Sequence, residues 1–118
     1  MKNKNYIIKY SGKKFNLQII SMNKSYFIYM GDNQMNFENL LISIPTYNDK
    51  EKDSTEDISS RFLIDDESND LSEVINNYLV SKLKIPIFFS CNIYDLLLLK
   101  DPLFISFLQE NLLKILMN

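Results

Sequence analysis

Apolar and polar residues alternate in two early stretches of the chain, and this pattern predicts two β-strands. Over residues 6–10 and 15–22, apolar side chains recur at every second position. A half-buried strand has this period because successive side chains point to opposite faces of a sheet. Ser11-Gly12-Lys13-Lys14 is expected to form the turn between them, and Asn23-Lys24 a hairpin turn to the next strand.

The third predicted strand, residues 25–30, lacks this alternation. It contains Tyr26-Phe27-Ile28-Tyr29-Met30, which is apolar at every position. A strand of this kind has both faces covered by its own chain, or one face against a partner. Three more strands are predicted over residues 39–45, 59–65 and 85–93, from their β-branched and aromatic residues.

Two helices are predicted where the spacing between apolar residues changes from two to three and four residues. The first begins at Leu71, after an acidic run at residues 65–70 that suits a helix N-terminus. The second begins at Asp101-Pro102, a favourable N-cap and first-turn pair, and runs to about Met117. The expected inward residues are Leu71, Val74, Ile75, Tyr78, Leu79 and Leu83 in the first helix, and Phe104, Phe107, Leu108, Leu112, Ile115 and Leu116 in the second.

The length and hydrophobic content of the chain suit one small α+β domain. The chain has 118 residues and 46% hydrophobic residues, enough for one core. Residues 47–57 are almost entirely polar and charged, and we expect a mobile loop there within a single domain spanning residues 1–118. Residues 94–100, with four leucines in succession, are expected to form a connector.

Charge and cysteine content narrow the classes of partner and compartment. The formal net charge is −2, and the basic residues look scattered or mixed with acidic ones, so no nucleic-acid partner is expected. No signal peptide or membrane span is apparent, so no membrane partner is expected either. The single cysteine, Cys91, fits a reducing compartment, the cytoplasm and also the nucleus.

The sequence offers no recognisable catalytic set. It contains no histidine and only two glycines, which excludes Ser-His-Asp chemistry, histidine-ligated metals and Gly-rich phosphate loops. Cys91 lies among apolar residues and is expected to be a buried, inert thiol. The acidic run at residues 65–70 lacks the glycine and final glutamate of a calcium loop, and helix capping accounts for it. We therefore expect no enzymatic activity, no metal and no cofactor.

Surplus apolar residues are the remaining functional signal. They occur in the third strand and in the leucine run, and the candidate partner-binding residues are Tyr26, Phe27, Tyr29, Leu96, Leu97 and Leu98. Two interpretations stay open for them. Either they fill a core from several directions, or they form a protein–protein interface, where aromatic and aliphatic anchors concentrate.

Several local sequences, in this order, resemble the proteasome assembly chaperone 4 family. Residues 25–31 are similar to its aromatic strand ending in glycine, and Asn39-Leu40 to the start of its next strand. Residues 62–70 and 87–93 are similar to a strand that runs into an acidic turn and to a strand with a Ser-x-Asn-aliphatic ending. Glu110-Asn111 matches a step in its terminal helix. The resemblance covers roughly residues 22–117.

The resemblance implies an antiparallel sheet of about six strands with two to three helices. It implies a chaperone that pairs with a related chaperone 3-like protein and promotes formation of the 20S proteasome α-ring by binding an α-subunit, alpha-5. Pairing of the isolated chain with itself is a further expectation. The alternative is a longin-like or profilin-like adaptor, also small and α+β, which binds a GTPase or actin.

Overall fold

A computed structural model describes residues 2–32, 37, 39–46, 57–64, 71–93 and 96–117. It confirms the predicted α+β fold class. The strands are β1 (Lys2–Tyr10), β2 (Lys13–Met22), β3 (Ser25–Gly31), β4 (Leu40–Thr46), β5 (Asp57–Ile64) and β6 (Ile87–Asn92). The helices are α1 (Leu71–Leu83), α2 (Leu96–Leu99) and α3 (Pro102–Leu116).

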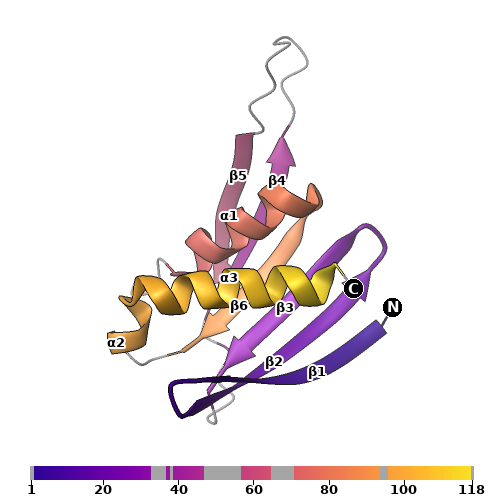
Figure 1. The fold of residues 1–118 in the computed structure, drawn as a ribbon. Coiled ribbons are helices and arrows are strands. Elements are labelled where there is room, and N and C mark those ends of the chain that lie inside the picture. Colours follow the sequence, from indigo (N-terminus) through magenta and orange to yellow (C-terminus); the bar gives the residue numbers. More distant parts are fainter. Residues whose placement is uncertain are drawn as a thin grey trace.

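The six strands form one sheet in the order β1-β2-β3-β6-β4-β5 (Figure 1). Four neighbouring pairs are antiparallel, as expected. The central pair, β3 and β6, is parallel, so the chain must cross from one half of the sheet to the other between them. This places β1 and β5 at the two edges.

Helices α1 and α3 both lie on one face of the sheet (Figure 1). The core lies between these two helices and the sheet. It is built from alternate residues of the strands and from one stripe of each helix. Ile28 and Phe89 from the central strands are fully buried in it, as are Ile75 of α1 and Leu108 of α3. No described helix lies on the opposite side of the sheet, which we call the outer face.

The β1–β2 hairpin is fixed to the start of α3. Tyr10 pairs with Lys13 across a two-residue loop in which Ser11 and Gly12 both have positive φ, as a tight hairpin requires. The Tyr10 hydroxyl donates a 3.2 Å hydrogen bond to Asp101. Asp101 also accepts a 3.0 Å bond from the Leu103 amide, which confirms the predicted N-cap.

The buried face of α1 differs from the predicted stripe. Val74 was expected inside but is 48% exposed, whereas Ser72 and Asn76 are fully buried. The Asn76 side-chain amide donates a 3.0 Å bond to the Ile87 carbonyl of β6, so a polar side chain ties the helix to the sheet. The apolar periodicity of the sequence alone could not show that the helix turns these polar residues towards the sheet.

The connector at residues 94–100 is also different from the prediction, because Leu96–Leu99 form the short helix α2. Of the loop expected at residues 47–57, Asp57 is the first residue of β5, and residues 47–56 lie outside the described residues, as does the acidic run at residues 65–70. None of the described helices is both long and apolar enough to cross a membrane.

Candidate functional site

An apolar row crosses the middle of the outer face. The strand registers align Ile20 with Phe27, Phe27 with Phe88, and Phe88 with Ile42. Because paired residues of neighbouring strands share a face, these four side chains form a band across four strands. All four are only partly buried. The same row ends in polar residues at the sheet edges, Asn3 on β1 and Arg61 on β5.

Two further aromatic rings, Tyr29 and Phe37, extend this apolar row. Phe37 lies nearly parallel to Phe27 and Tyr29, with interplanar angles of 14° and 10° and centroid distances of 6.5 and 6.3 Å. Phe37 remains 46% exposed. Tyr29 in turn lies over Gly31, where an added Cβ would come within 2.8 Å of the tyrosine hydroxyl. Glycine therefore allows Tyr29 to lie along the strand beside Phe37.

The outer face is neutral at this point. Burial and the negative charge of Asp32 both raise the pKa of Tyr29 above its ordinary value of 10. The phenol consequently stays protonated at physiological pH and presents an aromatic ring with a hydrogen-bonding tip. Such side chains are enriched at protein interfaces.

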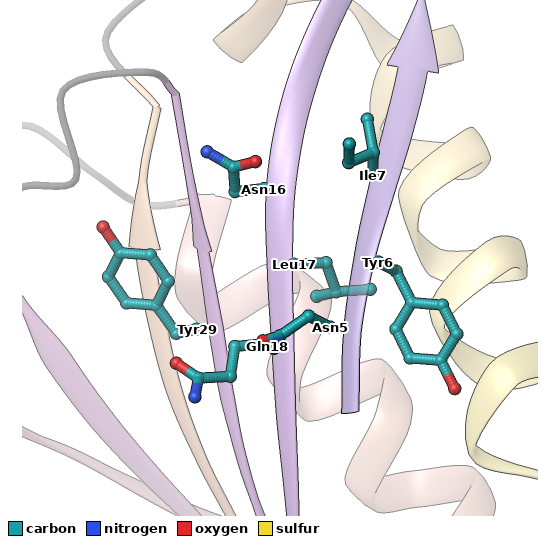
Figure 2. Close-up of a pocket in the computed structure, with 7 residues that line it drawn as sticks. All are labelled: Asn5, Tyr6, Ile7, Asn16, Leu17, Gln18 and Tyr29. Atoms are coloured by element: carbon teal, nitrogen blue, oxygen red, sulfur yellow. The ribbon is translucent and has the colours of Figure 1, made fainter. Parts of the chain in front are cut away.

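A depression of about 760 Å³ lies beside Tyr29, towards β1 (Figure 2). Asn5, Asn16, Gln18 and Tyr29 are among its lining residues. Figure 2 shows Gln18 and Tyr29 on the side of the sheet away from the helices, and Tyr6 on the helix side. The outer face thus combines an apolar centre with an amide-rich flank, as the core and rim of an interface do.

A buried hydrogen-bond network supports the outer face at the end of β6. The Asn39 side chain accepts a 3.0 Å bond from the Cys91 amide and donates a 2.6 Å bond to the Cys91 carbonyl. Ser90 donates a 2.6 Å bond to the Asn39 carbonyl, and Asn92 donates a 2.8 Å bond to Ser90. Asn39 therefore pairs with β6 as a strand residue would, at the point where β4 begins.

The predicted partner-binding residues fall in different places. Phe27 and Tyr29 lie together on the outer face. Tyr26 lies on the helix side and packs against the core. In α2, Leu98 is 7% exposed and belongs to the core, whereas Leu97 is 84% exposed. The side chain of Leu96 lies outside the described part of the chain. The structure thus brings together only Phe27 and Tyr29.

Leu97→Asp is expected to leave the fold intact and to weaken partner binding several-fold if α2 touches a partner. A side chain that is 84% exposed contributes little to the core, so its replacement should change the unfolding free energy by less than about 0.5 kcal/mol. Thermal unfolding and a titration with the purified partner measure the two effects. A large loss of thermal stability would place Leu97 in the core, and unchanged binding would exclude α2 from the interface.

Sequence reasoning missed four residues of the outer face: Ile20, Ile42, Phe88 and Phe37. A signal for Ile20 was present, since it follows Asn16 and Gln18 on the otherwise polar side of β2. The alignment of Phe88 and Ile42 with Phe27 depends on strand order, which no local pattern encodes.

Cys91 is fully buried in the core. In the part of the chain that the structure describes, no group of three or more His, Cys, Asp or Glu side chains is arranged to hold a metal ion. The arrangement on the outer face can bury apolar area against another protein.

Comparisons with known proteins agree with this fold. A chain in a structure titled "Crystal Structure of a Novel Chaperone Complex for Yeast 20S Proteasome Assembly" has a similar fold, with a TM-score of 0.63 and 12% sequence identity. The alignment covers 98% of the present chain and 91% of the yeast chain. No curated protein matches the sequence. The family model for proteasome assembly chaperone 4 matches residues 14–93, more than half of the sequence, and the chain therefore belongs to the proteasome assembly chaperone 4 family.

Proposed function

We propose that this protein promotes formation of the α-ring of the 20S proteasome as a heterodimer with a related, chaperone 3-like protein. The observation that carries the proposal is the apolar row on the outer face, in a chain of this family. In the proposed complex the row is covered by the sister chaperone, and the heterodimer binds an α-subunit, alpha-5. The place of action is the cytoplasm, and also the nucleus.

The apolar chemistry of the row supports its proposed role as an interface. Phe27, Phe88, Ile20 and Ile42 form a continuous apolar band, and Phe37 adds a further exposed ring. Exposed contiguous apolar surface of this kind marks protein interaction sites, because covering it removes apolar area from water. A related chain with a similar sheet could present a matching face, and two sheets pack face to face at a spacing of about 10 Å.

An assembly chaperone of this kind needs no reaction centre. Its task is to hold subunits in a correct order, which is a matter of differential binding. Neither a cofactor nor a catalytic residue is part of the proposal.

Affinity capture of the tagged protein from its own cells, followed by mass spectrometry, tests this function. We expect proteasome α-subunits and one small related protein, without mature β-subunits. Co-expression of that small protein with the present chain should then give a complex of one copy of each by light scattering. A stable homodimer that does not bind the small protein would contradict the proposed heterodimer.

A different set of captured proteins would overturn the chaperone role. A GTPase or actin without α-subunits would identify the protein as a longin-like or profilin-like adaptor that shares the chaperone fold only. A capture from cells that express an unrelated small tagged protein controls for abundant proteasome subunits.

A further inference from the structure

The β1–β2 hairpin concentrates positive charge at one edge of the sheet. Residues 1–31 contain six of the 13 basic residues and none of the 15 acidic ones. Five of the six lysines lie on the hairpin, namely Lys2, Lys4, Lys9, Lys13 and Lys14, and Lys24 lies in the turn between β2 and β3. Every one is exposed. The expectation that basic residues are scattered among acidic ones is therefore wrong for this part of the chain. The whole-chain charge of −2 hides a basic edge.

β1 is also an edge strand. It pairs with β2 on one side, and no described strand pairs with its other side. Tyr10 and Lys13 close a two-residue hairpin loop, so this pair exchanges both backbone hydrogen bonds, and the pattern alternates along the strands. The backbone N–H and C=O groups of Asn3, Asn5, Ile7 and Lys9 consequently point to the free edge.

The side chains along this edge define what can lie beside it. Lys2 and Lys4 project on the helix side, in line with Tyr6 and Ile8. Ile7 and Lys9 project on the outer face, and Ile7 is 64% exposed. An added strand would therefore need carboxylates opposite Lys2 and Lys4 on the helix side and an apolar residue opposite Ile7 on the outer face, since directly opposed cross-strand pairs interact.

We propose that the free edge of β1, with Lys2 and Lys4, binds an acidic, extended segment of a partner polypeptide, which adds a seventh strand to the sheet. Backbone hydrogen bonds supply the strand pairing, and charge complementarity selects the acidic segment. A second copy of this chain does not supply the required charges, because its own β1 carries lysines and no carboxylate. The proposal goes beyond the proposed function and does not depend on it.

The main alternative is that the lysines only prevent aggregation at a sheet edge. The two explanations differ in a measurable way. Lysines that merely repel neighbouring copies would show no preference for a strand-forming acidic peptide. A docking edge should bind one, and the binding should depend on both charge and backbone hydrogen bonding.

The test uses the peptide (Glu-Val)₄ with blocked ends, titrated into the full-length, ¹⁵N-labelled protein. We expect the amide signals of Asn3, Asn5, Ile7 and Lys9 to shift and their hydrogen exchange to slow. The peptide (Lys-Val)₄ should not bind. A (Glu-Val)₄ derivative with proline at its central valines keeps the charge but cannot form a strand, and should bind at least tenfold more weakly.

Two protein variants, with one control, distinguish the contribution of charge to peptide binding from that of backbone hydrogen bonding. The K2E/K4E variant should weaken (Glu-Val)₄ binding at least tenfold, and raising the salt from about 50 to 200 mM should weaken it in the wild type. The matched control R61E/K82E makes the same change in net charge elsewhere, on β5 and α1, and should bind within about twofold of wild type. Asn5→Pro removes one outward N–H and should also abolish strand addition.

Several outcomes would overturn the proposal. They are the absence of binding at millimolar peptide, equal binding of the proline derivative, or shifts confined to the apolar row of the outer face. Tighter binding of a DNA duplex of equal charge, or of phosphatidylserine vesicles, would also overturn it, because the edge would then recognise negative charge without a strand.

Discussion

Asn39→Ala is expected to lower the free energy of unfolding by about 3 kcal/mol and the thermal midpoint by about 10–15 °C. The Asn39 side chain satisfies both the amide and the carbonyl of Cys91, and all the atoms involved are buried. Truncation removes one hydrogen bond from each of these two buried backbone groups, at a cost of about 1–3 kcal/mol each. A loss of this size is a substantial share of the unfolding free energy of a small domain, which is about 5–15 kcal/mol.

Chemical denaturation followed by circular dichroism measures this loss. Asn39→Asp keeps the size and shape of the side chain but removes the donor to the Cys91 carbonyl, so it should also be strongly destabilising. Asn5→Ala, at an exposed position on β1, is the matched control and should change the unfolding free energy by less than about 0.5 kcal/mol. A stable Asn39→Asp variant would show that packing, and not hydrogen bonding, is what Asn39 contributes.

Phe27→Asp is expected to weaken binding of the sister chaperone at least 100-fold. Phe27 lies in the centre of the apolar row, between Ile20 and Phe88, and it stacks on Phe37. A carboxylate at this position would be buried without a partner in the complex, and loss of a central aromatic anchor typically costs 2–4 kcal/mol of binding free energy. Isothermal titration of the two purified proteins measures the change.

A second variant separates binding from folding, because Phe27 is itself partly buried. Phe37→Asp changes a side chain that is 46% exposed on the outer face, and it should weaken binding at least tenfold. Val74→Asp changes a side chain that is 48% exposed on α1, on the helix side, and should bind like wild type. If Val74→Asp weakens binding as much as Phe37→Asp, the partner does not recognise the outer face.

The sequence pattern predicted the elements well where one face of each is clearly apolar. The alternation in residues 6–10 and 15–22 corresponds to β1 and β2, and Asp101-Pro102 opens α3 as expected. The spacing of apolar residues was misleading in α1, where Ser72 and Asn76 are buried and Val74 is not. The bond to the Ile87 carbonyl offsets part of the cost of burying Asn76, whereas the Ser72 hydroxyl has no hydrogen-bond partner among the described residues. Apolar periodicity detects neither residue.

The candidate site could be predicted only in part. The unbroken apolar run in β3 pointed to Phe27 and Tyr29, because a strand apolar on both faces needs cover on both. The run could not show that Tyr26 faces the core, nor that Phe88 lies beside Phe27. Both facts depend on the pairing of β3 with β6, which is set by packing between distant segments. The basic edge was missed because the whole-chain charge averages two unlike regions.

The parallel pairing of β3 with β6 has a consequence for the order of folding. β1, β2 and β3 are joined by short turns and can pair early, whereas β3 meets β6 only after the intervening chain has closed a long loop. During synthesis, Phe27 leaves the ribosome long before Phe88. The two rings become neighbours only when the central pair has formed. A partner that requires both rings together would therefore discriminate a finished chain from a nascent or half-folded one, and an incomplete copy would be kept out of the complex.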